Sequence, residues 1–188
     1  MPIEVIASET IYHGRAFNVR RDKVRFQNQN IAHLDIIDHT GAVTILPLDA
    51  DGRIIFVRQY RHAVGLELLE LPAGTLEEDE QPENCALREI REETGFAAGK
   101  MVKVGEFYLA PGYSTEYMTV FLATDLTPSP LPGDADEFIT IEYVSIEQAY
   151  DLVVDGGLQD GEDGDRHEDF RPYLPGCLFG FWQAGDAA

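Results

Sequence analysis

The sequence predicts a mixed α/β domain that follows a small β-rich N-terminal subdomain. Residues 10–40 hold short, polar-rich segments with alternating side chains, which are typical of strands with one solvated face. Later apolar runs rich in β-branched residues predict buried strands. One segment near the middle of the chain carries start and stop signals for a helix. We therefore expect a subdomain at residues 1–40 and the main domain at residues 41–188.

The expected strands are separated by turn residues. The first two lie at AFNVRRDKVRF and IAHLDIID, with a turn at NQN between them. GAVTILPL (41–48) and RIIFVRQYR (53–61) flank the turn DADG, so we expect these two strands to pair. LELLELPAG (66–74) is a strand that runs into a Pro/Gly loop. The remaining expected strands are MVKVGEFYL (101–109), EYMTVFLATDL (116–126) and FITIEYVS (138–145).

Two helices are expected. The first spans residues 82–94, because Pro82 suits the first helical turn and Gly95 suits the C-terminal stop. The second, within SIEQAYDLVVDGG (145–157), opens with a capping pattern. Residues 159–170 are polar and expected as a loop, and the apolar stretch 173–182 is expected to dock on the body.

The composition excludes several classes of protein. With 188 residues and 44% hydrophobic residues, the chain is long and apolar enough to form a globular core. It has no apolar run that could span a bilayer and no signal-peptide pattern, so we expect a cytoplasmic protein without a membrane partner. A formal net charge of −20 argues against binding to nucleic acid. The cysteines, Cys85 and Cys177, match no metal or redox pattern.

The expected helix at 82–94 concentrates carboxylates on one face. At about 100° per residue, Glu89, Glu92 and Glu93 share a sector with Cys85, whose small side chain leaves room for a ligand. The expected core face holds Ala86, Leu87, Ile90 and Thr94, and Arg88 and Arg91 form a third sector. Glu89 and Glu93 repel each other at i,i+4 spacing without a partner on the helix, whereas Arg88 can pair with Glu92. A divalent cation such as Mg²⁺ would remove the repulsion, and the alternative is a solvated acidic face.

The spacing around this helix resembles the Nudix box, G-x5-E-x7-R-E-U-x-E-E-x-G-U, where U is apolar. Each fixed position is filled, by Gly74, Glu80, Arg88, Glu89, Ile90, Glu92, Glu93, Gly95 and Phe96. The resemblance implies an α/β/α sandwich with a mixed sheet that binds Mg²⁺ or Mn²⁺ and hydrolyses a nucleoside diphosphate linked to another group. It makes Glu89 and Glu93 the main metal ligands, assisted by Glu92 and by the carbonyl of Ala73. It also implies that Glu80 and Arg88 form an ion pair that holds the loop against the helix.

The regions flanking the box resemble ADP-ribose pyrophosphatases, also called ADP-sugar diphosphatases. These features are VRQYRHA (57–63), LELPAG (69–74) and APGYSTE (110–116), and Pro111 follows the end of the box by fifteen residues. The resemblance places the substrate-binding residues at Arg58, Arg61, Glu70, Pro111 and Glu116. The alternatives are solvent-facing arginines, a structural role for the two glutamates and an ordinary turn at Pro111. The resemblance also implies a homodimer that exchanges its N-terminal β-rich segments.

The sequence offers more than one candidate for the general base and more than one for the substrate. Relatives take the base from an acidic loop, here PGDADEF, where we favour Glu137 ahead of Asp134 and Asp136; a box glutamate, Glu92 or Glu93, is the alternative. The favoured reaction is cleavage of ADP-ribose to AMP and ribose 5-phosphate. GDP-mannose or NADH are alternative substrates, and a module that senses ADP-ribose without cleaving it is a third possibility. The complete box argues against the sensor. After residue 157 the chain departs from the family pattern.

Overall fold

The computed structural model describes residues 3–133 and 138–158. In chain order, its elements are β1 (Glu4–His13), β2 (Asn18–Arg25), β3 (Ile31–Asp38), β4 (Ala42–Pro47), β5 (Arg53–Arg61), β6 (Leu66–Glu70), β7 (Ala73–Thr75), α1 (Pro82–Thr94), β8 (Phe96–Tyr108), β9 (Tyr117–Pro128), β10 (Ile139–Ser145) and α2 (Ile146–Val154). The expectations for Asp134, Asp136, Glu137 and residues 159–182 lie outside the described residues.

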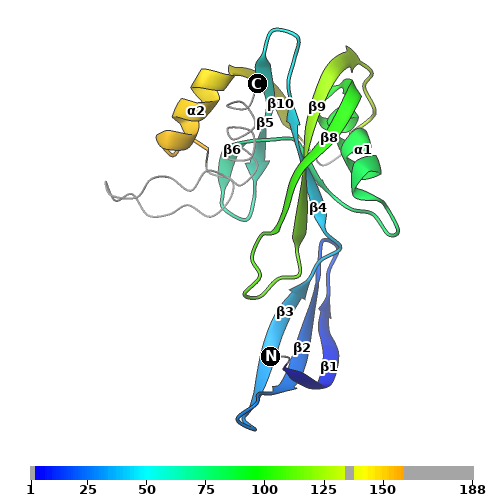
Figure 1. The fold of residues 1–188 in the computed structure, drawn as a ribbon, viewed down its shortest axis with the longest axis vertical. Coiled ribbons are helices and arrows are strands. Elements are labelled where there is room, and N and C mark those ends of the chain that lie inside the picture. Colours follow the sequence, from blue (N-terminus) through cyan, green and yellow to red (C-terminus); the bar gives the residue numbers. More distant parts are fainter. Residues whose placement is uncertain (1–2, 134–137, 159–188) are drawn as a thin grey trace.

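The first three strands form a sheet of their own in the order β1-β2-β3. This antiparallel sheet projects from the body of the molecule, as Figure 1 shows. Ion pairs between neighbouring strands support its register, with Arg21 2.7 Å from Asp35 and Arg25 2.8 Å from Glu4. The sequence analysis did not anticipate that β1 would begin as early as Glu4.

The body consists of two sheets between two helices, with α2 beside the sheet β10-β5-β6 and α1 beside the sheet β7-β4-β9-β8 (Figure 1). The second sheet is mixed, because β4 runs parallel to β9 while the other pairs are antiparallel. The predicted α/β fold with a mixed sheet is therefore confirmed. One apolar cluster joins α1 to β4 and β9, and another joins α2 to β5, β6 and β10.

The expected pairing of β4 with β5 is wrong. β4 lies between β7 and β9, so both of its edges are occupied, and β5 pairs with β6 and β10 in the other sheet. The two segments meet at an isolated bridge between Leu48 and Ile54 and a hydrogen bond from the N–H of Asp49 to the carbonyl of Arg53. The turn between them bends sharply, because the Asp49 carboxylate accepts the N–H groups of Asp51 and Arg53 at 2.9 and 2.8 Å. This turn passes the chain from one sheet to the other.

The first helix begins and ends as predicted, and the second begins with the predicted cap. Pro82 occupies the start of α1, and Gly95 ends the helix in the left-handed conformation, with φ of 77°. Ser145 and Gln148 form a reciprocal capping box on α2. The predicted core face of α1 needs two corrections, since Leu87 is exposed while Cys85 is buried beside Ile90. In addition, β8 starts at Phe96 rather than at residue 101. None of the helices in the described part of the chain is long and apolar enough to cross a membrane.

Candidate active site

The short strand β7 brings the backbone of Gly74 against α1. β7 pairs with β4, and Gly74 lies opposite Val43 in that ladder. A Cβ atom on Gly74 would lie only 2.0 Å from the carboxyl carbon of Glu89. A larger side chain would force the Glu89 carboxylate away from this position, so the glycine of the box permits the close approach of Glu89.

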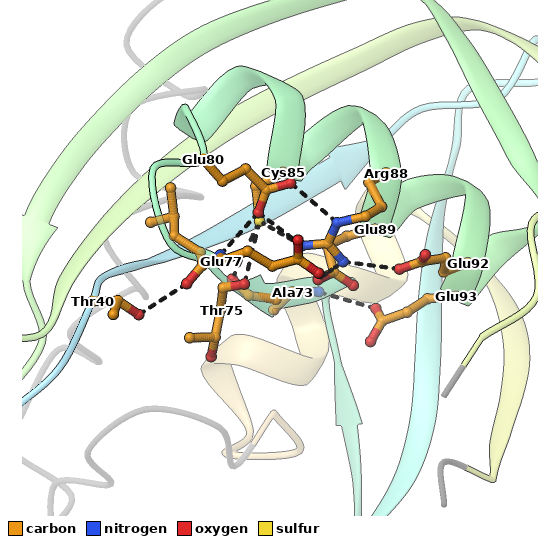
Figure 2. Close-up of polar contacts among 12 residues, drawn as sticks. Thr40, Ala73, Thr75, Glu77, Glu80, Cys85, Arg88, Glu89, Glu92 and Glu93 are labelled. Carbon is orange, nitrogen blue, oxygen red and sulfur yellow. Dashed lines mark hydrogen bonds and ion pairs between the residues drawn. The ribbon is translucent and has the colours of Figure 1, made fainter. Parts of the chain in front are cut away.

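A second contact joins the same strand to the last turn of the helix. The buried Glu93 carboxylate accepts a hydrogen bond from the N–H of Ala73 at 3.0 Å. Glu89 and Glu93 therefore both face the segment that leads into the helix, as Figure 2 shows. The structure thus brings the predicted metal ligands to one place, with the Ala73 backbone beside them.

Arg88 lies at the centre of the carboxylates in Figure 2. Its guanidinium donates to Glu80 at 3.1 and 3.0 Å, to Glu89 at 2.6 Å and to Glu92 at 2.9 Å. The predicted ion pair between Glu80 and Arg88 is confirmed. The expectation that Glu89 has no oppositely charged partner on the helix is wrong, because the adjacent Arg88 reaches it. The i,i+4 pair of Arg88 with Glu92 forms as expected.

The electrostatics of this cluster favour an additional cation. Hydrogen bonds to Glu80, the charge of Glu89 and hydrogen bonds to Glu89 and Glu92 raise the pKa of Arg88. The hydrogen bond from Arg88 lowers the pKa of the Glu80 carboxyl. One guanidinium contacts three carboxylates, so this group keeps a negative excess when all are ionised. Glu92 and Glu93 also lie in the last helical turn, where the helix dipole disfavours negative charge.

The donor set fits a hard divalent cation by its chemistry. Carboxylate and carbonyl oxygens are the ligands that Mg²⁺ and Mn²⁺ prefer, and the Glu89 carboxylate lies directly against the backbone of Gly74. Within residues 3–133 and 138–158, no three His, Cys, Asp or Glu side chains are arranged to hold a metal ion as they stand. Two of the predicted ligands, Glu89 and Glu92, are turned toward Arg88. A cation therefore has to compete with this arginine for their oxygens.

Cys85 does not line the ligand space, contrary to expectation. Its side chain is fully buried in the core cluster beneath the helix. Burial raises the pKa of its thiol to about 12, and the neighbouring Glu80 adds to the effect. The thiol therefore stays protonated, and its sulfur lies 3.7 Å from the carbonyl of Thr75 and 3.4 Å from Nη2 of Arg88.

The two predicted phosphate-binding arginines each contact a glutamate on a neighbouring strand. Arg61 donates to the buried Glu70 through Nε at 3.0 Å and through its Nη2 at 2.6 Å. Arg58 donates to Glu142 of β10. Neither arginine is simply a solvent-facing side chain, because each is oriented by a carboxylate from the same sheet. Glu70 thus contacts Arg61 and fixes the orientation of its guanidinium.

Pro111 and Glu116 lie on the loop between β8 and β9. β8 starts directly after α1 and runs to this loop, which lies next to the N-terminal sheet (Figure 1). The loop is closed by a hydrogen bond from the N–H of Leu109 to the carbonyl of Glu116 at 3.1 Å. The structure therefore gathers the box residues into one cluster and places this pair on a separate loop.

Sequence reasoning missed two polar residues that organise these groups. Glu142 orients Arg58, and Thr115 joins its loop to the chain after β3. The alternation of FITIEYVS does place Glu142 on one face of its strand. Its partner depends on the register between β10 and β5, which the local sequence does not specify.

The fold and the carboxylate cluster together define a Nudix-type hydrolase. The family model described as the NUDIX domain matches residues 38–165, so the chain belongs to the NUDIX family. The chain is 38% identical to an ADP-ribose pyrophosphatase of Bacillus subtilis (80% of this chain, 82% of the relative) and 44% identical to one of Mycobacterium tuberculosis (82% and 76%). A GDP-mannose pyrophosphatase of an Enterobacter species is 33% identical, covering 77% of this chain and 81% of the relative. A solved structure titled as an ADP compounds hydrolase superposes with a TM-score of 0.79 at 26% identity, covering 99% of this chain and 96% of that one.

Proposed function

We propose that this protein hydrolyses the diphosphate bond of ADP-ribose or a related ADP-sugar, giving AMP and a sugar phosphate. The observation that carries the proposal is the complete carboxylate cluster on α1 and β7. It occurs in a chain whose similarity to ADP-ribose pyrophosphatases reaches 44% identity. Similarity to the GDP-mannose pyrophosphatase is lower, at 33% identity, so GDP-mannose is the second candidate substrate.

In this proposal, Glu89, Glu93, Glu92 and the Ala73 carbonyl would hold Mg²⁺ or Mn²⁺. The bound cation would neutralise charge on the diphosphate and lower the pKa of the attacking water. Glu80 and Arg88 keep the loop against the helix through their two hydrogen bonds, at 3.1 and 3.0 Å. Gly74 and Gly95 permit the close approach and the helix end that this geometry requires.

Arg61 and Arg58 would bind the diphosphate. A guanidinium presents planar, paired N–H donors that suit phosphate oxygens, and a carboxylate partner restricts its orientation before substrate arrives. Glu70 positions Arg61, while Pro111 and Glu116 would contact the sugar or the ribose from the β8–β9 loop. Each arginine stays about two-fifths exposed, with 37% for the Arg58 side chain and 44% for that of Arg61, so both remain accessible to a ligand.

Glu137 would act as the general base that accepts the proton of the attacking water, with Asp134 and Asp136 near it in the sequence. These residues lie outside the described part of the chain. The alternative base is Glu92 or Glu93. Replacing Glu137 with Gln is expected to lower kcat by at least about 10²-fold if it is the base. A kcat within about threefold of the parent would assign the base to a box glutamate instead.

The test of the substrate is a panel of ADP-ribose, GDP-mannose and NADH with Mg²⁺, scored for nucleoside monophosphate release. The proposal expects AMP from ADP-ribose at a kcat/KM at least about tenfold above the other two compounds. Preferred turnover of GDP-mannose would contradict it. Calorimetric binding of ADP-ribose without turnover would identify a sensor.

The test of the site is Glu93→Gln, with Glu83→Gln in the first turn of the same helix as its matched control. Loss of a ligand carboxylate should lower kcat by at least about 10²-fold, while the control should keep the parent rate. Calorimetry with Mn²⁺ alone should show weaker binding by the Glu93 variant. Equal rates and equal metal binding in both variants would reject the ligand assignment.

We also propose that the protein is a cytoplasmic homodimer assembled through the sheet β1–β3. Residues 1–40 contain five basic and five acidic residues, so the whole excess of −20 lies in the remainder of the chain. This neutral sheet exposes Val5, Ile11, Tyr12 and Ile31. A neutral, apolar surface lets two highly acidic chains associate.

The test of the dimer is the mass in solution. Light scattering should give about 42 kDa, twice the 21.0 kDa of one chain. Val5→Lys should lower this mass, and Val104→Lys on β8 should not.

A further inference from the structure

The loop at residues 109–116 is attached to the end of β3 by backbone hydrogen bonds. The N–H of Ile37 donates to the carbonyl of Tyr113 at 2.8 Å, and the N–H of Thr115 donates to the carbonyl of Ile37 at 3.0 Å. Ile37 and Ser114 form a short parallel bridge. The loop that carries Pro111 and Glu116 is therefore hydrogen-bonded alongside the end of β3 in the N-terminal sheet.

The hydroxyl group of Thr115 reinforces this attachment. It accepts the N–H of His39 at 2.9 Å. The same hydroxyl has three acceptors within reach of its single proton, namely the carbonyls of His39 at 3.3 Å and Ile37 at 3.5 Å and the Asp38 carboxylate at 3.4 Å. A methyl group in place of the hydroxyl would leave the half-buried His39 N–H without this acceptor.

Polar contacts continue from Asp38 into the N-terminal sheet. The Asp38 carboxylate accepts from Arg20 Nη1 at 2.8 Å, and Arg20 Nε donates to Asp22 at 3.3 Å. Asp22 is buried, with 6% of its surface exposed, and also accepts from the hydroxyl of Ser8 at 2.6 Å. Arg20 is therefore held between two carboxylates, Asp22 and Asp38. The contacts thus run without interruption from β1 to Thr115.

We propose that Thr115 is a positioning residue through which the N-terminal sheet sets the conformation of the substrate loop. It would hold Glu116, its neighbour in the chain, and Pro111 in the orientation that receives the sugar. The substrate contact rests on the proposed function, whereas the coupling of sheet to loop rests on the contacts alone. Because the site of hydrolysis lies on α1, the coupling acts on substrate binding rather than on the chemical step.

The test compares Thr115→Val, which keeps the shape and removes the hydroxyl, with Thr115→Ser, which keeps the hydroxyl. Thr127→Val, an exposed threonine farther along β9, is the matched control. Thr115→Val should raise KM for ADP-ribose by about 5- to 10-fold with kcat within about twofold. Thr115→Ser and the control should both stay within about twofold of the parent. Arg20→Met should raise KM by about two- to threefold, since its ion pairs are partly exposed.

Amide hydrogen exchange supplies a readout that does not depend on the substrate. Faster exchange of residues 110–117 in Thr115→Val, restored in Thr115→Ser, supports the coupling even if the parent protein does not cleave ADP-ribose. Unchanged KM and unchanged exchange in Thr115→Val overturn it. A fall in kcat with constant KM would overturn the assignment to substrate binding. Wild-type exchange in Arg20→Met, with unchanged KM, would overturn the part of the proposal that extends into the N-terminal sheet.

Discussion

Gly74→Ala provides a stringent test of the site, because the structure defines where the added methyl group would go. An alanine Cβ would lie 2.0 Å from both the carboxyl carbon and Oε1 of Glu89, and 2.4 Å from its Cγ. A relaxed contact between carbon atoms is about 3.5 Å, so the carboxylate must retreat by roughly 1.5 Å. The strand conformation of β7 itself tolerates alanine, and its backbone pairing with β4 is unaffected.

The expected consequence is loss of activity with retention of the fold. Bonds from Mg²⁺ to oxygen are about 2.0–2.1 Å long and demand a near-ideal geometry, so a ligand displaced by more than 1 Å no longer coordinates. A displacement of this size at a catalytic centre costs about 10²-fold in rate. We expect kcat to fall by at least that factor, and the affinity for Mn²⁺ alone to weaken. The thermal midpoint should stay close to that of the parent.

The assay measures Mg²⁺-dependent AMP release, with thermal unfolding recorded on the same samples. Gly105→Ala is the matched control, because a Cβ at this strand position meets only Val120 at 4.0 Å. It should leave both rate and stability nearly unchanged. A Gly74→Ala protein with a rate within about threefold of the parent would refute the argument that Glu89 must occupy this space. An unfolded Gly74→Ala protein would mean that the glycine serves the fold.

Three further predictions concern stability and reactivity. Ile90→Ala should lower the free energy of unfolding by about 2–5 kcal/mol, because Ile90 is fully buried; denaturant titration giving less than about 1 kcal/mol would contradict the packing of α1. Glu80→Gln should lower the thermal midpoint at neutral pH. Since the hydrogen bond from Arg88 lowers the pKa of the Glu80 carboxyl, this stabilisation is fully present above the unfolded-state pKa and disappears as the pH falls through the folded-state pKa, so a gap that does not narrow on acidification would contradict it. In a Cys177→Ser background, Cys85 should resist iodoacetamide at about pH 8 until the protein unfolds, because burial raises the pKa of its thiol to about 12; rapid labelling of the folded protein would show that it is accessible.

Local sequence was sufficient to predict α1 and much of the box. Pro82 and Gly95 set the two ends of the helix through backbone conformation alone, and they did so in the structure. The ion pair of Arg88 with Glu92 also followed from spacing, since i,i+4 geometry is built into a helix, whereas the pair with Glu80, which precedes the helix, was implied by the resemblance to the box. The helical periodicity nevertheless misjudged the burial of Cys85 and Leu87. The face that a helix buries depends on how it is rotated against its sheet.

The contacts of the substrate-binding candidates could not be predicted in the same way. Arg58 and Arg61 were recognised as arginines near the box, but their partners Glu142 and Glu70 come from different strands. Each of these pairs requires the correct register of β5 against its neighbours. Several β-branched segments of this chain satisfy the local requirements of a strand equally well, so pattern alone does not select a partner.

The sequence by itself determined the reaction class, the bounds of α1, the capped start of α2 and the crowding of carboxylates on one helix. All of these depend on residues within a few turns of one another. Only the tertiary structure decided that β4 and β5 belong to different sheets, that Arg88 holds two of the predicted metal ligands, and that the loop of Pro111 and Glu116 is attached to the N-terminal sheet. The physical reason is that short-range geometry follows from backbone conformation, whereas pairing across the sequence is chosen by which surfaces can be buried together.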